Sequence, residues 1–227
     1  MRCESAAPEA AWGDATHLAP KGSVSDARRL SEEEFDRWID NTHAFDPDVG
    51  QQAPIQGLRV PTGVGKSFAA REAAVRLARD LAAKKDPRSI VIFVPKHALG
   101  TEYIEEINRI AGGISVEVYR GRDRADPRAE GEKMCRRADE AIEVQRAGAD
   151  VDSTLCKAGS ARCAFYEVCG YLKQKKTTAQ IWIAPHQLLW RAPPTQIKPA
   201  AVVVDEEATG GRSKGLTEPQ CFYPWTI

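Results

Sequence analysis

The chain has 227 residues, enough for one α/β core with an inserted segment. Lys plus Arg and Asp plus Glu both number 32, so no overall basic field marks a nucleic-acid binder, and a polyanion would need a local patch. No apolar run reaches membrane-spanning length and no secretory signal opens the chain. We therefore expect a cytoplasmic protein with reduced cysteines and without a membrane partner.

The sequence divides into five parts. Residues 1–30 are rich in Ala, Pro, Gly and Ser without periodicity, and we expect a flexible arm there. Residues 31–120 alternate between strand and helix patterns and form the first part of an α/β domain, which residues 177–208 complete. Between them, residues 121–176 are polar and hold four of the six cysteines. Residues 209–227 show no strand or helix pattern and form an irregular tail.

Two elements are expected before the first glycine-rich turn. Residues 31–34, Ser-Glu-Glu-Glu, have the pattern of a capping box, which predicts a short helix starting at Ser31. Phe35, Trp38 and Ile39 form its apolar face. A strand is expected over residues 55–60.

The sequence of residues 61–67 is typical of a phosphate-binding loop. Its glycines let the backbone wrap around phosphate oxygens, and the N–H groups at the start of the following helix favour an anion. Lys66 supplies a positive charge for the β- and γ-phosphates, and the Ser67 hydroxyl suits a Mg²⁺ ligand. A plain glycine turn before a helix is the alternative. The residues expected to bind ATP are Pro61, Thr62, Gly63, Val64, Gly65, Lys66 and Ser67.

The elements after this loop follow from their hydrophobic periodicity. Residues 67–84 have one apolar face and predict a helix. Residues 89–94 are a continuous apolar run, typical of a central parallel strand that is covered on both faces. The alternation over residues 114–118 indicates a more peripheral strand. Further strands are expected at 181–183 and 201–204.

The last of these strands ends in two acids, Asp205 and Glu206. Ligands of parallel α/β sheets bind beyond the carboxyl ends of the strands. We therefore expect Asp205 to lie beside the loop at residues 61–67 and to hold Mg²⁺ through water. Glu206 would orient or deprotonate the water that attacks the γ-phosphate.

The order of these motifs resembles that of superfamily 2 helicases. Residues 61–67 are similar to helicase motif I, and Val60 stands where many other phosphate loops have Gly. Residues 91–99 look like motif Ia, and residues 205–208 resemble motif II. Four cysteines between motifs Ia and II are typical of the iron–sulfur helicases, the XPD/DinG-like family. Residues 181–189 resemble the segment that follows the cluster in that family.

This resemblance implies a P-loop NTPase fold with a RecA-like parallel sheet and a cysteine-rich, metal-binding insertion. It implies ATP hydrolysis coupled to binding of single-stranded or forked DNA, with Lys66, Asp205 and Glu206 as catalytic residues and Ser67 and Asp205 as Mg²⁺ ligands. Lys96, His97 and His186 are the nucleic-acid contacts that it implies. Because helicases need a second RecA-like domain, we expect a separate chain to supply it and this chain to bind ATP but hydrolyse it weakly.

The cysteine set is Cys135, Cys156, Cys163 and Cys169. Three of them lie in a hydrophilic stretch, where an ordinary core role does not explain them. Four thiolates can hold a 4Fe–4S cluster or a tetrahedral Zn²⁺. The spacing lacks the short knuckles of zinc sites, which together with the family position favours iron–sulfur, with zinc as the alternative.

Two other functions stay open. The chain could be a non-enzymatic, metal-stabilised nucleic-acid-binding module whose loop holds nucleotide structurally. It could also be an inactive remnant of a longer helicase, because the sequence ends soon after the two acids.

Overall fold

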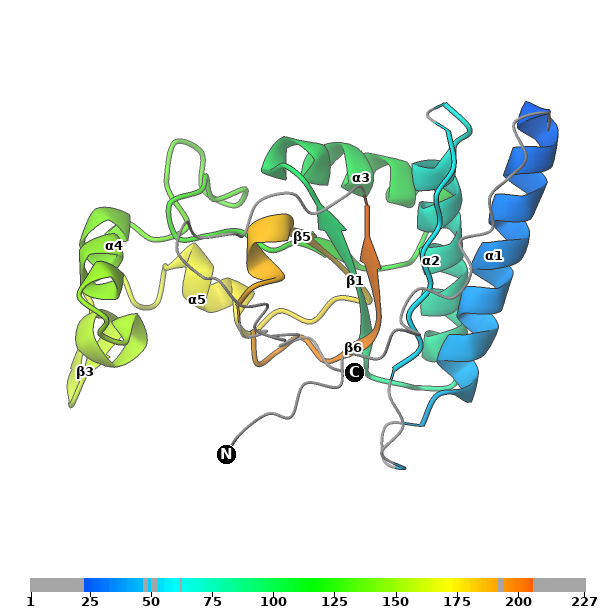
Figure 1. Cartoon of the computed structure of the whole chain (residues 1–227). Coiled ribbons are helices and arrows are strands. Elements are labelled where there is room, and N and C mark those ends of the chain that lie inside the picture. The colour runs from blue at the N-terminus through cyan, green and yellow to red at the C-terminus, as the bar shows by residue number, and fades with distance from the viewer. Residues whose placement is uncertain (1–22, 47–48, 50–52, 62, 192–193, 206–227) are drawn as a thin grey trace, which may run out of the picture.

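The computed structural model describes residues 23–46, 49, 53–61, 63–191 and 194–205. They form a mixed α/β structure around one parallel sheet, with a cysteine-rich segment to one side (Figure 1). The predictions for Thr62 and Glu206, for the first 22 residues and for the tail lie outside the described residues. In the part that the structure describes, no helix combines the length and the apolar character needed to cross a bilayer.

The sheet has four strands in the order β2-β5-β1-β6, and all its pairings are parallel. Its strands are β1 (Ser89–Val94), β2 (Val116–Val118), β5 (Ile181–Pro185) and β6 (Pro199–Val204). Every residue of β1 is buried, and Phe93 pairs with Ala184 on one side and Val204 on the other. The predicted α/β class, the central position of β1 and the peripheral position of β2 are thus confirmed.

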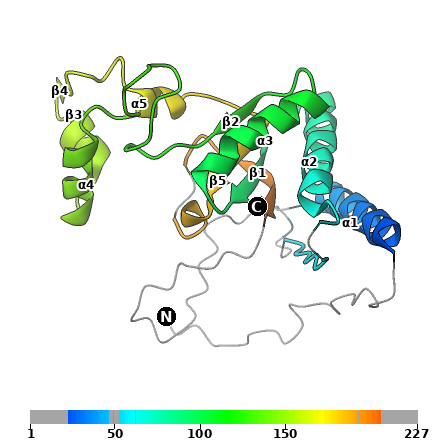
Figure 2. The same ribbon diagram turned by 90° about the horizontal axis from the view of Figure 1, so that it is seen from above.

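Three helices build the layer on one face of the sheet. α2 (Lys66–Ala83) and α3 (His97–Ile110) contact the sheet, and α1 (Val24–Ala44) packs on the outer side of α2 (Figures 1 and 2). The predicted helix over 67–84 is confirmed to within one residue at each end. A buried apolar cluster lies between these helices and the sheet. Its members that are less than 2% exposed are Ala73, Ala74, Val75, Leu77, Ala78, Ile90, Ile92, Val94, Ile107, Ala111, Ile181, Ile183 and Ala200.

The first helix begins earlier than predicted. Ser23 caps α1 through a capping box with Asp26, so residues 24–30 are helical and do not belong to a flexible arm. Ser31 instead lies buried within the helix, and its hydroxyl donates to the Ala27 carbonyl (2.7 Å). Both serines carry the same capping pattern, and the upstream one starts the helix.

The strand expected over residues 55–60 is absent from the described residues. The segment 53–61 has no regular secondary structure, although Val60 is buried. The Gln56 side-chain amide donates to the Glu34 carbonyl of α1 (2.8 Å). The segment therefore contacts a helix, which cannot offer the ladder of hydrogen bonds that defines a strand.

The opposite face of the sheet has a smaller apolar cluster. Val91, Phe93 and Trp182 point into it, and they are fully buried. Ile197, which precedes β6, and Tyr119, which follows β2, close this side. The 3-10 turn η3 (His186–Leu188) lies on the same side, at the end of β5.

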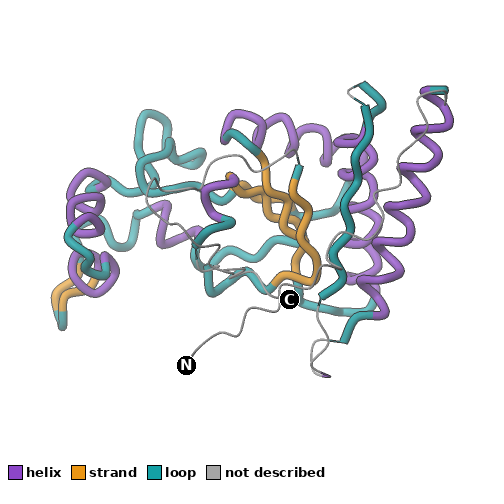
Figure 3. The backbone as a smooth tube through the Cα atoms, in the orientation of Figure 1, coloured by secondary structure: helices purple, strands orange, loops and turns teal. Residues whose placement is uncertain are grey.

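The cysteine-rich segment, residues 121–176, joins two strands that pair with each other, β2 and β5. Much of its length is loop, and it projects away from the sheet (Figure 3). Its elements are α4 (Ala138–Arg146), the π-helical turn η2 (Asp152–Cys156), β3 (Lys157–Ala158), β4 (Ala161–Arg162) and α5 (Gly170–Gln174).

Candidate functional site

The glycine-rich turn, which we define as residues 61–67, leads directly into α2. Gly63 (φ 84°) and Gly65 (φ 97°) both adopt left-handed backbone, which side chains disfavour. Gly65 is the N-cap of α2, and no side chain caps this helix. The first N–H groups of α2 thus have no side-chain partner among the described residues, a geometry suited to an anion.

Asp205 lies beside this turn, although 138 residues separate it from Ser67. It follows β6, and its backbone N–H donates to the Phe93 carbonyl of β1 (2.9 Å), which continues the sheet by one bond. The Ser67 hydroxyl donates to Asp205 Oδ1 (3.0 Å). The sheet therefore brings together the two groups that the sequence suggested as Mg²⁺ ligands.

Tyr103 of α3 donates its hydroxyl to the other carboxylate oxygen, Asp205 Oδ2. The Arg71 guanidinium stacks over the tyrosine ring, 4.5 Å from its centre, and forms an ion pair with Glu106 (2.6 Å). Burial, and then the hydrogen bond to Asp205, raise the pKa of Tyr103 above its usual value, so the phenol stays a proton donor. No sequence pattern indicated this contact, because an aromatic residue on an amphipathic helix indicates only core packing.

Two positively charged side chains lie at this site, one within the turn and one on α1. Lys66 is half-buried, and the described residues give it no hydrogen-bond or ion-pair partner. Arg28 of α1 donates from Nε to the Val64 carbonyl within the turn (3.0 Å). Sequence reasoning missed Arg28, because α1 reaches the turn only through its packing on α2.

The nucleic-acid candidates follow two neighbouring strands. Lys96 comes after β1 and is exposed, and His97 is the first residue of α3, with its side chain outside what the structure describes. His186 comes after β5, and its Nε2 donates to the backbone carbonyl of Asp205 (3.0 Å). The His186 ring thus supports the end of β6, a contact that its position in the sequence did not suggest.

The four cysteines form two pairs, and none is in a disulfide. Cys156 precedes β3 and Cys163 follows β4, so this hairpin brings them together, and the Cys163 N–H donates to the Cys156 carbonyl (3.0 Å). Cys135 and Cys169 lie together in one buried cluster. Cys169 also contacts the Met134 carbonyl (3.4 Å).

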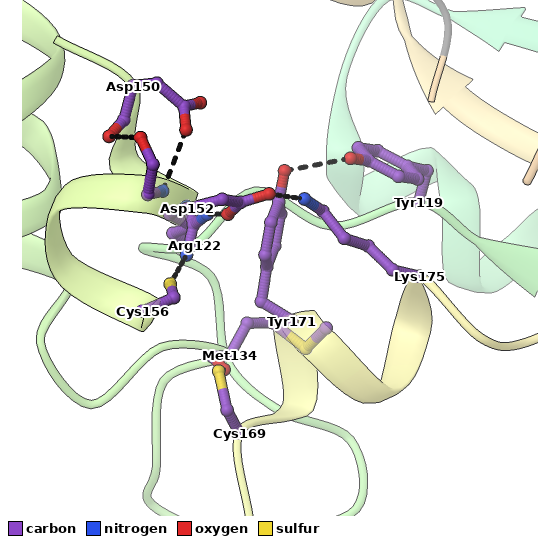
Figure 4. Close-up of polar contacts among 10 residues, drawn as sticks. Tyr119, Arg122, Met134, Asp150, Asp152, Cys156, Cys169, Tyr171 and Lys175 are labelled. Atoms are coloured by element: carbon purple, nitrogen blue, oxygen red, sulfur yellow. Dashed lines mark hydrogen bonds and ion pairs between the residues drawn. The ribbon is translucent and has the colours of Figure 1, made fainter. Parts of the chain in front are cut away.

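Arg122 links the two pairs, and Figure 4 shows its contacts with Cys156 and Asp152. Its Nη1 donates to Cys156 Sγ (3.5 Å), its backbone carbonyl accepts from the Cys135 N–H (2.9 Å), and its guanidinium stacks 4.0 Å from the centre of the Tyr171 ring. It also forms an ion pair with Asp152 (2.5 Å). The cysteine-rich segment is therefore organised around one arginine.

This environment changes the acidity of the buried thiols. Interaction with the Cys169 thiol, aided by Arg122, lowers the pKa of Cys135 below its usual value, against the opposing effect of burial. The same interaction, with burial, raises the pKa of Cys169. The pair thus loses its first proton readily and retains the second, as expected for two coupled groups.

The geometry of the thiols does not by itself form a ligand shell. Among the described residues, no three His, Cys, Asp or Glu side chains are arranged to hold one metal ion. The donor set nevertheless has the chemistry of a thiolate site, with four free thiols in two pairs. A metal would have to draw the pairs together around Arg122.

A cleft of about 760 Å³ lies between the cysteine-rich segment and the sheet. Four basic side chains and two tyrosines line it, together with Asp123, Asp150 and Asp152. The basic residues and tyrosines are Arg122, Arg124, Lys175, Arg191, Tyr119 and Tyr171. Its lining thus combines cations with aromatic rings, but acids reduce its net charge.

In comparisons with known proteins, no family model, no curated protein and no solved structure matches the chain.

Proposed function

We propose that the protein is an ATP-binding motor domain of the helicase type, with its nucleotide site at the glycine-rich turn. The observation that carries the proposal is the 3.0 Å hydrogen bond from the Ser67 hydroxyl to Asp205, across 138 residues of sequence. The proposal needs these two groups side by side, next to one Mg²⁺ ion. The N–H groups that begin α2, which have no side-chain partner among the described residues, support it further.

In this proposal each residue has a defined role. The backbone of the turn holds the α- and β-phosphates, and Lys66 contacts the β- and γ-phosphates as a point charge. Ser67 would bind Mg²⁺ while its hydroxyl donates a hydrogen bond to Asp205, and Asp205 would hold the ion through water. Mg²⁺, when bound, neutralises charge on the phosphates. Glu206 completes the proposal as the group that positions the attacking water.

The test is Mg²⁺-dependent binding of ATP, measured by isothermal titration calorimetry. Lys66→Ala and Asp205→Asn should each weaken binding in Mg²⁺ by at least about tenfold, because each removes a charge next to the phosphates or the ion. Lys84→Ala, at the other end of α2, is the matched control and should leave binding unchanged. Equal affinity of the wild type and both variants would refute the proposal.

We further propose that Cys135, Cys156, Cys163 and Cys169 hold a 4Fe–4S cluster, with Zn²⁺ as the alternative. The buried apolar cluster of the cysteine-rich segment supports this, because among the described residues its buried members are Cys135, Cys169 and Ala138 alone. Four bonds to a metal would supply the cohesion that so small a core does not. The proposed role of the metal is structural, and a reducing, cytoplasmic location suits the free thiols.

Protein purified without oxygen should contain iron and acid-labile sulfide, or else one zinc, in stoichiometric amount. Cys156→Ser should lose the metal, whereas Ser153→Ala, in the same turn, should retain it. Wild-type protein that contains neither metal and cannot be reconstituted with either would exclude the site.

The partners in this proposal are single-stranded or forked DNA and a separate chain with a second RecA-like domain. The basic and aromatic lining of the 760 Å³ cleft supports a DNA contact. Exposed Lys96, at the end of β1, is the candidate on the nucleotide side. Phosphate contacts would make binding steeply dependent on salt and independent of sequence.

The cleft also favours a second candidate function, a non-enzymatic DNA-binding module. Anisotropy of a labelled forked DNA separates the two. Under the motor proposal, a non-hydrolysable ATP analogue changes DNA affinity in the wild type and not in Lys66→Ala. DNA affinity that is insensitive to nucleotide in both proteins, with no phosphate release, would favour the module.

A further inference from the structure

The carboxylate of Asp205 accepts from two hydroxyls on two different helices. Ser67 of α2 donates to Oδ1 (3.0 Å), and Tyr103 of α3 donates to Oδ2. The proposed nucleotide chemistry uses only the first of these contacts. The second therefore needs its own explanation.

The surroundings of Tyr103 hold its hydroxyl in one place. The side chain is 5% exposed, and its ring lies under the Arg71 guanidinium, 4.5 Å away. Arg71 is itself 8% exposed and is tied to Glu106, one turn further along α3, by a 2.6 Å ion pair. A ring stacked and buried in this way offers a fixed donor to the carboxylate.

The rest of Asp205 is already fixed through its backbone. Its N–H donates to Phe93 (2.9 Å) and its carbonyl accepts from His186 (3.0 Å). Rotation of the carboxylate is the freedom that these bonds leave. A carboxylate has about four lone-pair positions, so the two hydroxyls occupy about half and leave the others for water on a metal ion.

We infer that Tyr103 is a positioning residue for Asp205, which fixes the rotation of the carboxylate so that its remaining lone pairs face the Mg²⁺ of the nucleotide site. The inference rests on the proposed function, because it concerns the same ion. In this inference Tyr103 is not a ligand of the ion or of the nucleotide, and it acts through Asp205. Partners of this kind commonly change metal affinity by about 10- to 100-fold.

Tyr103→Phe removes the donor and keeps the ring under Arg71. With a fluorescent, non-hydrolysable ATP analogue as the probe, the Mg²⁺ concentration for half-maximal binding should rise about tenfold. Binding of the analogue in excess EDTA, which reports the turn alone, should stay as in the wild type. If Tyr103 had only a structural role, the substitution would lower the affinity for the analogue equally in Mg²⁺ and in EDTA.

Tyr119→Phe is the matched control. It also removes the hydroxyl of a buried tyrosine that shares a hydrogen bond, here with Tyr171 (3.0 Å), but it lies on the other face of the sheet. It should leave the Mg²⁺ requirement unchanged.

Three results would overturn the inference. If the wild type needs Mg²⁺ and Tyr103→Phe needs no more of it, Tyr103 does not position Asp205, and the proposed function stands. An equal loss of affinity in Mg²⁺ and in EDTA would assign Tyr103 to packing alone. If the wild type binds the analogue without any Mg²⁺ requirement, the inference and the proposed role of Asp205 fail together.

Discussion

The two regions of this protein are held together by different physics. In the sheet region, the side chains of Ile90, Ile92, Ile181 and Ile183 are almost completely removed from water. In the cysteine-rich segment, the buried apolar cluster is small, and charged and polar contacts converge on Arg122 instead. Hydrophobic burial contributes more to the free energy of folding than such polar contacts do, and it depends less on the protonation of individual groups. We therefore expect the sheet to fold without help and the segment to depend on its charges and on the metal proposed for it.

The way in which the segment is connected to the sheet predicts how the two regions unfold. It joins β2 to β5, which are paired neighbours, so both of its ends are anchored in the stable region. A polar unit tied at both ends can loosen without unfolding the sheet. We therefore expect the segment and the sheet to unfold in two separate transitions, which respond differently to substitutions and to pH.

The largest effect should come from a cavity in the sheet core. Ile183→Ala removes a fully buried side chain of β5 and should lower the free energy of unfolding by about 2–5 kcal/mol. Urea unfolding followed by circular dichroism measures this. Val204→Ala, at the 45% exposed end of β6, should cost less than about 1 kcal/mol. Similar costs for the two changes would contradict a sheet held by burial.

A second test removes the centre of the cysteine-rich segment. Arg122→Ala breaks the ion pair with Asp152 and the contacts with Cys156 and Tyr171, and it should lower the free energy of local opening by about 1.5–3 kcal/mol. Hydrogen exchange should show faster exchange in residues 121–176 and unchanged protection in β1. Arg124→Ala, whose side chain is 54% exposed, is the control and should have little effect. Loss of protection in both regions would show that they are one cooperative unit.

Acid should destabilise the cysteine-rich segment before it destabilises the sheet. Burial acts to raise the pKa of Asp152, but its contacts with Lys175 and Arg122 outweigh this and hold the pKa below the ordinary 3.8. Its ionised form therefore stabilises the segment above about pH 4, and this contribution is lost as the pH falls below that value. Proteolysis between about pH 5 and pH 3 should cut the segment before the sheet. An acid sensitivity that Asp152→Asn does not reduce would assign it to other groups.

The smallest effect should come from a surface ion pair in the sheet region. Asp36 of α1 and Arg76 of α2 are 2.6 Å apart, and both side chains are about half exposed. Asp36→Ala should cost less than about 1 kcal/mol, because water screens such pairs. Thermal unfolding measures the change. A cost comparable to that of Arg122→Ala would mean that polar contacts matter equally in the two regions.

Much of the sheet region could be predicted because its elements are encoded locally. The apolar run at 89–94 predicted a central strand, and the periodicity of 67–84 predicted α2. Both patterns need only nearby residues to be recognised. The start of α1 was mispredicted because Ser23 and Ser31 offer equivalent caps, and only one helix can form. The prediction of a strand over 55–60 was wrong for a related reason. A strand forms only beside a partner strand, and the sequence of the segment does not indicate that partner.

The amino-acid sequence alone identified the residues that could serve chemistry in this protein: the glycines and Lys66-Ser67 of the turn, Asp205 at the end of an apolar strand, and four cysteines in a polar segment. It determined them because residue type and spacing are local properties of the chain. Tertiary structure alone decided that Ser67 and Asp205 touch, that Tyr103 holds the second carboxylate oxygen, and that Arg122 joins the thiols. These contacts span 34 to 138 residues, and only the packing of helices on a parallel sheet, and of loops around an arginine, sets such distances.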